Sequence, residues 1–181
     1  MSNRPKVYIM SGISGAGKTT EAERIAKHYG TSPITVSADR YFVKNDGKYK
    51  FNAAELPQAH AYCLLKFTEV IYGSYSGQWL GYTAAVIVDN TNLTTVEMAP
   101  YVALAMACGC EVEIVTVHCD PKVAAERNIH NVSASTIERM DKALRFRELP
   151  PFWRVTQRTI DTNPANMVVE QKPRRYSRTP F

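Results

Sequence analysis

The sequence predicts an α/β fold, in which a doubly wound, mainly parallel sheet carries helices on both faces. Apolar runs typical of buried strands alternate along the 181 residues with segments of helical periodicity. One run, residues 84–88, is apolar throughout, as expected of a central parallel strand that is buried on both faces. A glycine-rich loop follows the first run and leads directly into a helix, which is the start of a strand–loop–helix unit.

The glycine-rich loop spans residues 12–19 and reads Gly-Ile-Ser-Gly-Ala-Gly-Lys-Thr. It matches the P-loop pattern, in which backbone N–H groups turn inward onto a polyphosphate at the N-terminus of a helix. Lys18 is expected to neutralise the β- and γ-phosphates of ATP, and the Thr19 hydroxyl is expected to hold Mg²⁺. The sequence therefore predicts a P-loop NTPase fold of the kinase-like type, with ATP and Mg²⁺ as ligands. The expected nucleotide-binding residues are Gly12, Ser14, Gly15, Ala16, Gly17, Lys18, Thr19 and Thr20.

The other elements follow with short connections. The P-loop helix is expected to end at Gly30, and Asn52 and Thr94, each with a glutamate three residues later, are expected to cap two further helices. Two short helices beginning near residues 121 and 135 are interpreted as a lid over the phosphates. Strands are predicted at 33–37, 84–88 and 111–119, weaker strand patterns lie at 153–160 and 167–169, and connections are predicted at 41–51 and 73–82.

Two carboxylates come directly after predicted strands. Asp39 follows the strand at residues 33–37, and Asp89 ends the apolar run at 84–88. Ligands of an open parallel sheet bind at the carboxyl ends of its strands, so both side chains are functional candidates. Asp89 resembles a Walker B aspartate, so Thr19 and Asp89 form the predicted metal site. The alternative is that Asp89 only caps the turn after its strand.

Aromatic residues gather after Asp39. They could offer a stacking surface to a base or cover the hydrophobic core, and the sequence leaves both roles open. His60, in the following helix, lies on an apolar stripe and is interpreted as a core or boundary residue. The aromatic residues are Tyr41, Phe42, Tyr49 and Phe51.

The chain has a formal net charge of +5 and a pI near 9.0, a balance compatible with polyanionic partners. Its basic residues cluster in and after the second lid helix and again at the C-terminus. Each cluster is either a nucleic-acid contact or a solvated surface. The clusters are Arg139, Lys142, Arg145 and Arg147, and Lys172, Arg174, Arg175 and Arg178.

The length predicts a single domain at residues 1–171, followed by a basic tail at 172–181. No apolar stretch approaches the roughly 18 residues of a membrane span, and the N-terminus leaves no room for a signal peptide. The four cysteines lack the spacing of a disulfide framework, so reduced thiols in a cytoplasmic protein are expected. Three of them, with a histidine between residues 108 and 119, could be taken for a metal cluster but are interpreted as ordinary buried residues.

Three further segments accompany the P-loop: Ser-Ala-Asp-Arg-Tyr at residues 37–41, Asp-Asn-Thr-Asn at 89–92 and Arg-Asn-Ile-His at 127–130. Together they resemble the small P-loop kinases related to the kinase domain of phage-type polynucleotide kinase. The resemblance implies that Asp39 is the general base that takes the proton of the acceptor hydroxyl. It also implies that Arg127 faces the ATP phosphates. The expected catalytic residues are Lys18, Asp39 and Arg127.

The same resemblance implies transfer of the γ-phosphate of ATP to a hydroxyl on nucleic acid, with DNA as the expected partner. The acceptor is either a 5′-hydroxyl end or the hydroxymethyl group of a modified pyrimidine such as 5-hydroxymethyluracil in DNA, because the group includes phage kinases of both kinds. Phe42 and Asn131 stand where polynucleotide kinases have arginines. These two departures predict different contacts with the acceptor.

Two other functions fit the same motifs. A small-metabolite or nucleoside kinase would use the same P-loop, and the basic tail would then be incidental. An ATP-binding switch or adaptor would bind ATP without transferring phosphate, but such a module has no need of the carboxylate at Asp39. A GTPase is disfavoured because the sequence has no Asn-Lys-x-Asp segment.

Overall fold

A parallel sheet forms the centre of the protein, in a computed structural model that describes residues 5–29, 33–43, 46–75, 85–129 and 132–164. Five strands lie in the order β2-β3-β1-β4-β5, and every pairing is parallel. This confirms the predicted α/β class. The strands are β1 (Lys6–Ser11), β2 (Ile34–Val36), β3 (Ala85–Val88), β4 (Val112–His118) and β5 (Val155–Asp161). The helices are α1 (Lys18–His28), α2 (Leu56–Tyr75), α3 (Thr95–Ala107), α4 (Pro121–Arg127) and α5 (Ala134–Arg145), with the 3₁₀ helices η1 (Ala38–Phe42) and η2 (Ala53–Glu55).

Two hydrophobic cores cover the two faces of the sheet. Successive residues of a strand point to opposite faces, so Val7 and Ile9 of β1 pack with α2 and α3, whereas Tyr8 and Met10 pack with α1 and α5. All four residues of β3 are buried, which explains its continuous apolar run. Each fully buried aliphatic side chain of this kind stabilises the fold by about 1.5–3 kcal/mol.

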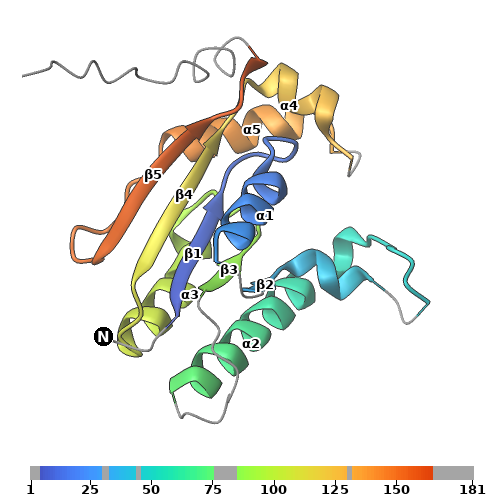
Figure 1. Ribbon diagram of the computed structural model, residues 1–181. Helices are drawn as coiled ribbons and strands as arrows, with labels where there is room; N and C mark the ends of the chain where they lie inside the picture. The colour runs from blue at the N-terminus through green and yellow to red at the C-terminus, as the bar shows by residue number, and fades with distance from the viewer. Residues whose placement is uncertain (1–4, 30–32, 44–45, 76–84, 130–131, 165–181) are drawn as a thin grey trace, which may run out of the picture.

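The strand register brings several loops to one edge of the sheet. Ile9 pairs with Val88, and Ser11 pairs with Thr116, so the carboxyl ends of β1, β3 and β4 lie next to one another. The P-loop leaves this edge from β1, and α4 and α5 lie at the same end of the sheet (Figure 1). The predicted lid helices therefore stand above the P-loop.

Most predicted boundaries hold, with three differences. The predicted capping box of Thr94 and Glu97 is present at the start of α3. The Asn52 side chain caps η2 rather than α2 itself, since its Oδ1 accepts from the Ala54 N–H at 3.1 Å. Helix α2 continues past Gly73, where a connection was predicted, because Val70 and Ile71 are buried and their packing outweighs the low helix propensity of glycine.

The third difference lies after β2, where the predicted loop at residues 41–51 begins inside η1. The Ser37 hydroxyl accepts from the N–H of Asp39 at 3.2 Å and so caps this short helix. The predicted strand at 167–169, the basic tail at 172–181 and Asn131 lie outside the described residues.

Arg147, one of the basic residues in and after the second lid helix, packs against the sheet. Its guanidinium turns under the carboxyl edge of the sheet and donates to the hydroxyl of Ser11, to the carbonyl of Asn92 at 3.2 Å and to the hydroxyl of Thr116 at 3.0 Å. Arg145 is paired with Asp141 at 2.7 Å. These bonds hold the half-buried Arg147 against the sheet, whereas the sequence left both a nucleic-acid contact and a solvated surface open for its cluster.

An ion-pair network attaches the edge strand β5 to its neighbours. Arg158 of β5 donates to Glu113 of β4 at 2.7 Å and to Glu21 of α1 at 3.1 Å. Although burial opposes ionisation, the hydrogen bonds from Arg24 and Arg158 hold the pKa of Glu21 below its ordinary value. Strand β5, which is only partly buried, is thereby linked to the helix that follows the P-loop.

The described residues contain no helix that is long and apolar enough to span a membrane. Cys63, Cys108 and Cys119 are buried, and Cys110 is half-buried. Among the same residues, no three His, Cys, Asp or Glu side chains come together in a way that could hold a metal ion. Cys108 and Cys110 precede β4, whereas His118 and Cys119 lie at the other end of that strand.

Phe42 provides a test of the core. Its side chain is fully buried in the core beneath α2 and α3, so Phe42→Arg, which introduces the arginine of polynucleotide kinases, would bury an unpaired charge. We expect the free energy of unfolding, measured with urea, to fall by at least about 3 kcal/mol. Tyr72→Arg, at an exposed position of α2, is the matched control and is expected to change it by less than about 0.5 kcal/mol. Equal stability of both variants would contradict the buried placement of Phe42.

Candidate active site

The P-loop is shaped by glycines that approach two backbone carbonyls. Gly12 and Gly15 have φ angles of 151° and 82°, which side chains rarely adopt. A Cβ atom on Gly12 would lie 2.5 Å from the carbonyl oxygen of Val117, and one on Gly15 would lie 2.0 Å from that of Ala124. The loop can therefore pack against β4 and α4 only if these positions lack a side chain.

A large cavity lies beside the P-loop, and not every predicted nucleotide-binding residue lines it. Ser14, Gly15, Gly17, Lys18, Thr19 and Thr20 line it. Gly12 and Ala16 are buried, and their N–H groups donate within the protein, to Thr91 at 2.9 Å and to Ile13 at 3.2 Å. In this structure these two residues give the loop its shape.

Lys18 is a half-buried cation at the start of α1. Its ammonium donates to the carbonyl of Ile13 at 2.8 Å. Burial lowers its pKa to about 8, although the nearby charges of Asp89 and Asp39 oppose the shift. An anionic phosphate placed beside this ammonium would stabilise its charged form. The site thus fits a nucleoside triphosphate.

Thr19 and Asp89 lie side by side in the same cavity as Lys18. The Thr19 hydroxyl donates to Oδ2 of Asp89 at 2.8 Å. Burial raises the pKa of Asp89, while the hydrogen bond from Thr19 and the charge of Lys18 oppose that rise. A hydroxyl and a carboxylate beside a phosphate cradle are the few protein ligands that Mg²⁺ needs, because it keeps waters and phosphate oxygens in its shell. The donor set fits the predicted metal site.

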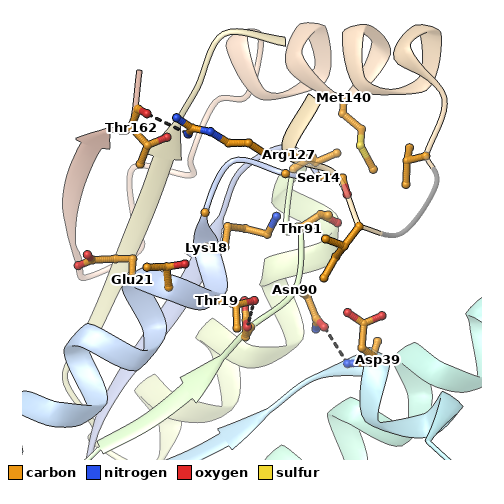
Figure 2. Close-up of a pocket in the computed structure, with 18 of the residues that line it drawn as sticks. Ser14, Lys18, Thr19, Glu21, Asp39, Asn90, Thr91, Arg127, Met140 and Thr162 are labelled. Carbon is orange, nitrogen blue, oxygen red and sulfur yellow. Dashed lines mark hydrogen bonds between the residues drawn. The ribbon is translucent and has the colours of Figure 1, made fainter. Parts of the chain in front are cut away.

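Asp39 lies across the cavity from the P-loop, at the start of η1 (Figure 2). Its Oδ1 accepts a hydrogen bond from the phenol of Tyr49 at 3.2 Å. Burial and the charge of Asp39 raise the pKa of Tyr49 to about 12, so the phenol remains protonated and acts as a donor. A hydroxyl group already occupies the position from which Asp39 would accept a proton.

Two asparagines after β3 bond to neighbouring segments at the carboxyl edge of the sheet. Oδ1 of Asn90 accepts from the N–H of Ala38 at 2.8 Å and so attaches η1, with Asp39, to the end of β3. The side chain of Asn92 donates to the carbonyl of Met10 at 2.7 Å, beside the start of the P-loop. Both residues belong to the motif at residues 89–92, which predicted no role for them. Their position could have been recognised from the sequence, because both are polar residues that closely follow a buried strand.

The aromatic residues after Asp39 divide between the two roles left open by the sequence. Phe42 is fully buried and Tyr41 is half-buried against the core. Tyr49 and Phe51 are exposed and line the cavity together with Leu56 and His60. His60 is exposed as well, so it lies at the boundary of the apolar stripe rather than in the core.

The lid is bonded directly to the P-loop. Ser14 donates to Oδ1 of Asn128 at 3.1 Å, and Nδ2 of Asn128 donates to the carbonyl of Val132 at 2.9 Å. Arg127 lines the cavity, but its guanidinium donates to the carbonyl of Thr162 at 3.0 Å and points away from Asp39 (Figure 2). The Thr162 hydroxyl in turn donates to the carbonyl of Ala16 at 2.9 Å, a link that the sequence did not predict.

The cavity beside the P-loop has a volume of about 2220 Å³. Ligand pockets commonly measure about 300–1,000 Å³, so there is room for a nucleotide and for a second substrate. Lys18, Thr19, Asp39, Asp89 and Arg127, which are the predicted catalytic and metal residues, all line it. The sequence predictions thus converge on a single site.

Residues 7–147 match the family described as AAA domain, AAA_33, which is more than half of the chain. The chain belongs to the AAA_33 family. These are P-loop proteins, so binding of a nucleoside triphosphate, typically with Mg²⁺, follows from membership of AAA_33. A human relative, NEDD4-binding protein 2 of Homo sapiens, is 33% identical over 138 residues, which cover 74% of this chain but only 7% of that protein. The chain therefore corresponds to a small segment of this relative.

Solved kinase structures share the fold of this AAA_33 chain. A gluconokinase from Sinorhizobium meliloti 1021 is 18% identical, with a TM-score of 0.55, over 91% of this chain and 87% of its own. The APS kinase CysC of Mycobacterium tuberculosis is 16% identical, with a TM-score of 0.51, over 88% and 89%. A chain of the Pnkp1/Rnl/Hen1 RNA repair complex is 15% identical, with a TM-score of 0.62, over 81% and 46%. At these identities the likeness concerns the fold, which is that of P-loop kinases.

The pKa of Lys18 predicts how ATP affinity depends on pH. A lysine with a pKa of about 8 is mostly protonated at pH 7 and mostly neutral at pH 9. If only the charged form binds phosphate well, the affinity for ATP should fall about tenfold between these two values. Titration with labelled ATP measures this. Lys18→Arg, which stays charged, should remove the pH-dependent step whatever its absolute affinity. A wild-type affinity that does not change with pH would contradict the role of the ammonium.

Proposed function

We propose that the protein is an ATP- and Mg²⁺-dependent kinase that transfers the γ-phosphate of ATP to a hydroxyl on nucleic acid. The observation that carries this proposal is the shared cavity, in which the Asp39 carboxylate faces the P-loop and already accepts a hydrogen bond from a hydroxyl. A P-loop that only binds and releases nucleotide needs no such carboxylate.

The residues of the cavity divide the work of phosphoryl transfer among them. The N–H groups of the loop and the ammonium of Lys18 bind the phosphates of ATP. Thr19 and Asp89 would hold Mg²⁺, which supplies positive charge to the phosphate oxygens when it is bound. Asp39 takes the proton from the acceptor hydroxyl while the oxygen of that hydroxyl attacks the γ-phosphorus of ATP. ADP leaves as the new P–O bond forms. Arg127 is the residue that we assign to the negative charge of the transition state.

Nucleic acid as the acceptor is supported by the chemistry around Asp39. Arg139 of α5 lines the cavity, and two exposed aromatic side chains lie beside the carboxylate. Positive charge combined with exposed rings is the usual surface for single-stranded nucleic acid. The buried position of Phe42 means that it cannot replace the substrate-contacting arginine of polynucleotide kinases. A 5′-hydroxyl end and a hydroxymethyl pyrimidine in DNA therefore both remain acceptors in this proposal.

Asp39→Asn separates binding from chemistry. The variant keeps the shape of the side chain but cannot take a proton, so kcat should fall by about 10²- to 10⁴-fold while ATP affinity stays within about twofold. Single-turnover transfer and ATP titration measure the two quantities. Glu69→Gln, on the exposed surface of α2, is the control and should change neither. Loss of ATP binding with an unchanged chemical step would instead make Asp39 a ligand of the metal or nucleotide.

An acceptor screen tests the proposed substrate. Labelled ATP is incubated with single-stranded DNA, with free nucleosides and sugars, and without acceptor, and transfer to DNA is expected to be fastest. Its acceptor KM should rise steeply with salt because phosphate contacts release counterions. Arg139→Ala should lower the slope of log KM against log salt by about one, whereas Arg154→Ala, an exposed arginine outside the cavity, should leave it unchanged.

The screen also separates the alternatives. Transfer to a nucleoside or metabolite with DNA ignored at every salt concentration would replace the proposal by a small-molecule kinase. ATP binding without transfer to any acceptor would indicate a switch or adaptor. Digestion of labelled DNA distinguishes the two nucleic-acid acceptors, since phosphatase removes a 5′-terminal phosphate and a phosphorylated base is recovered from internal positions.

A further inference from the structure

A short segment, Asp46–Phe51, brings two aromatic side chains to the cavity, and we call it the aromatic strap. Its backbone is bonded at several points. The Lys48 N–H donates to Oδ1 of Asp46 at 3.0 Å, the Lys50 N–H donates to the carbonyl of Phe42 at 2.9 Å, and Tyr49 forms an antiparallel bridge with Val43. The positions of Tyr49 and Phe51 therefore follow from backbone geometry.

The buried ring of Phe42 supports both exposed rings. Its centroid lies 6.1 Å from that of Tyr49 and 5.1 Å from that of Phe51, with interplanar angles of 73° and 59°. Such tilted pairs stabilise aromatic clusters beyond the burial of their area. Tyr49 remains 42% exposed and Phe51 52% exposed, and both line the cavity. The rings of Tyr49 and Phe51 thus pack against Phe42 on one side and remain exposed to the cavity on the other.

The hydroxyl of Tyr49 fixes the distance between this aromatic surface and the carboxylate. Its oxygen lies 3.2 Å from Oδ1 of Asp39, so a planar group resting on the strap would lie within one ring's length of the proposed base. Lys48 and Lys50 are exposed on the same segment and add positive charge beside the rings. Rings interleaved with cations complement a strand of bases and phosphates.

We propose that Tyr49 and Phe51 form a subsite for an unstacked nucleobase of the acceptor strand, which rests on the function proposed above. The base lies against the rings of the aromatic strap while its own or its sugar's hydroxyl reaches Asp39. A base inside a duplex has both faces covered by its neighbours, so the subsite selects single-stranded or flipped-out nucleotides.

Base stacking can be measured without any catalysis. The probe is a short single-stranded oligothymidylate carrying one 2-aminopurine, at its 5′ end or at its centre, whose fluorescence is quenched when it stacks. Binding is followed separately by anisotropy in the presence of ADP. We expect quenching of one of the two probes at saturation. Replacing that 2-aminopurine by an abasic nucleotide should weaken binding by roughly tenfold or more.

The variants assign the effect to the strap. Phe51→Ala should abolish most of the quenching and reduce the penalty of the abasic probe to about twofold or less. Phe152→Ala is the matched control, because Phe152 is an exposed phenylalanine outside the cavity, and it should behave as the wild type. Tyr49→Phe keeps the ring and should keep the quenching. An unchanged affinity for ADP in each variant shows that the P-loop side of the site is intact.

The outcomes separate this subsite from the proposed reaction. Saturated binding without quenching of either probe, or quenching that survives Phe51→Ala, would overturn the subsite and leave transfer to DNA standing. Quenching that depends on Phe51 but is accompanied by no transfer to any nucleic-acid hydroxyl would support the subsite and overturn the reaction.

Discussion

The close packing of the P-loop backbone against β4 and α4 is the constraint on which the site depends. At Gly15 the nearest carbonyl, that of Ala124, is so close that even a methyl group cannot be placed there. At Gly12 the carbonyl of Val117 has the same effect on the side of the sheet. The P-loop therefore packs tightly between the sheet and the first lid helix, α4. This packing fixes the backbone that positions Lys18 and Thr19.

The fold could be predicted largely from local patterns. A parallel strand buried on both faces must be apolar throughout, and the run at residues 84–88 has this property. The capping box at Thr94 likewise needs only residues that are close in the sequence. What the sequence did not predict depends on distant contacts. The spacing of the basic residues in and after the second lid helix does not predict where Arg147 lies. Its position depends on hydrogen bonds to Ser11, Asn92 and Thr116.

The residues of the candidate site also divide into those marked by a local sequence pattern and those placed by distant contacts. Lys18, Thr19, Asp39 and Asp89 could be predicted because a motif, or the end of a buried strand, marks each of them. Asn90 and Thr162 act through bonds to residues 52 and 146 positions away, and no local pattern marks such partners. The aromatic residues after Asp39 were ambiguous for a related reason, since identical residue types in one loop serve the core at Phe42 and the cavity at Phe51. Only the three-dimensional packing distinguishes them.

The bonds of Arg147 have a mechanical consequence for the lid. Arg147 follows α5 directly and joins that end of the helix to β1, β4 and the loop after β3, while the Thr95 hydroxyl donates to the carbonyl of the next residue, Glu148, at 2.6 Å. This end of α5 is thereby attached to the sheet. The helix has 12 residues and is about 18 Å long, so a rotation of about 10° about this attached end would move its other end by about 3 Å. A displacement of that size is about the diameter of a water molecule, and residues of α5 line the cavity.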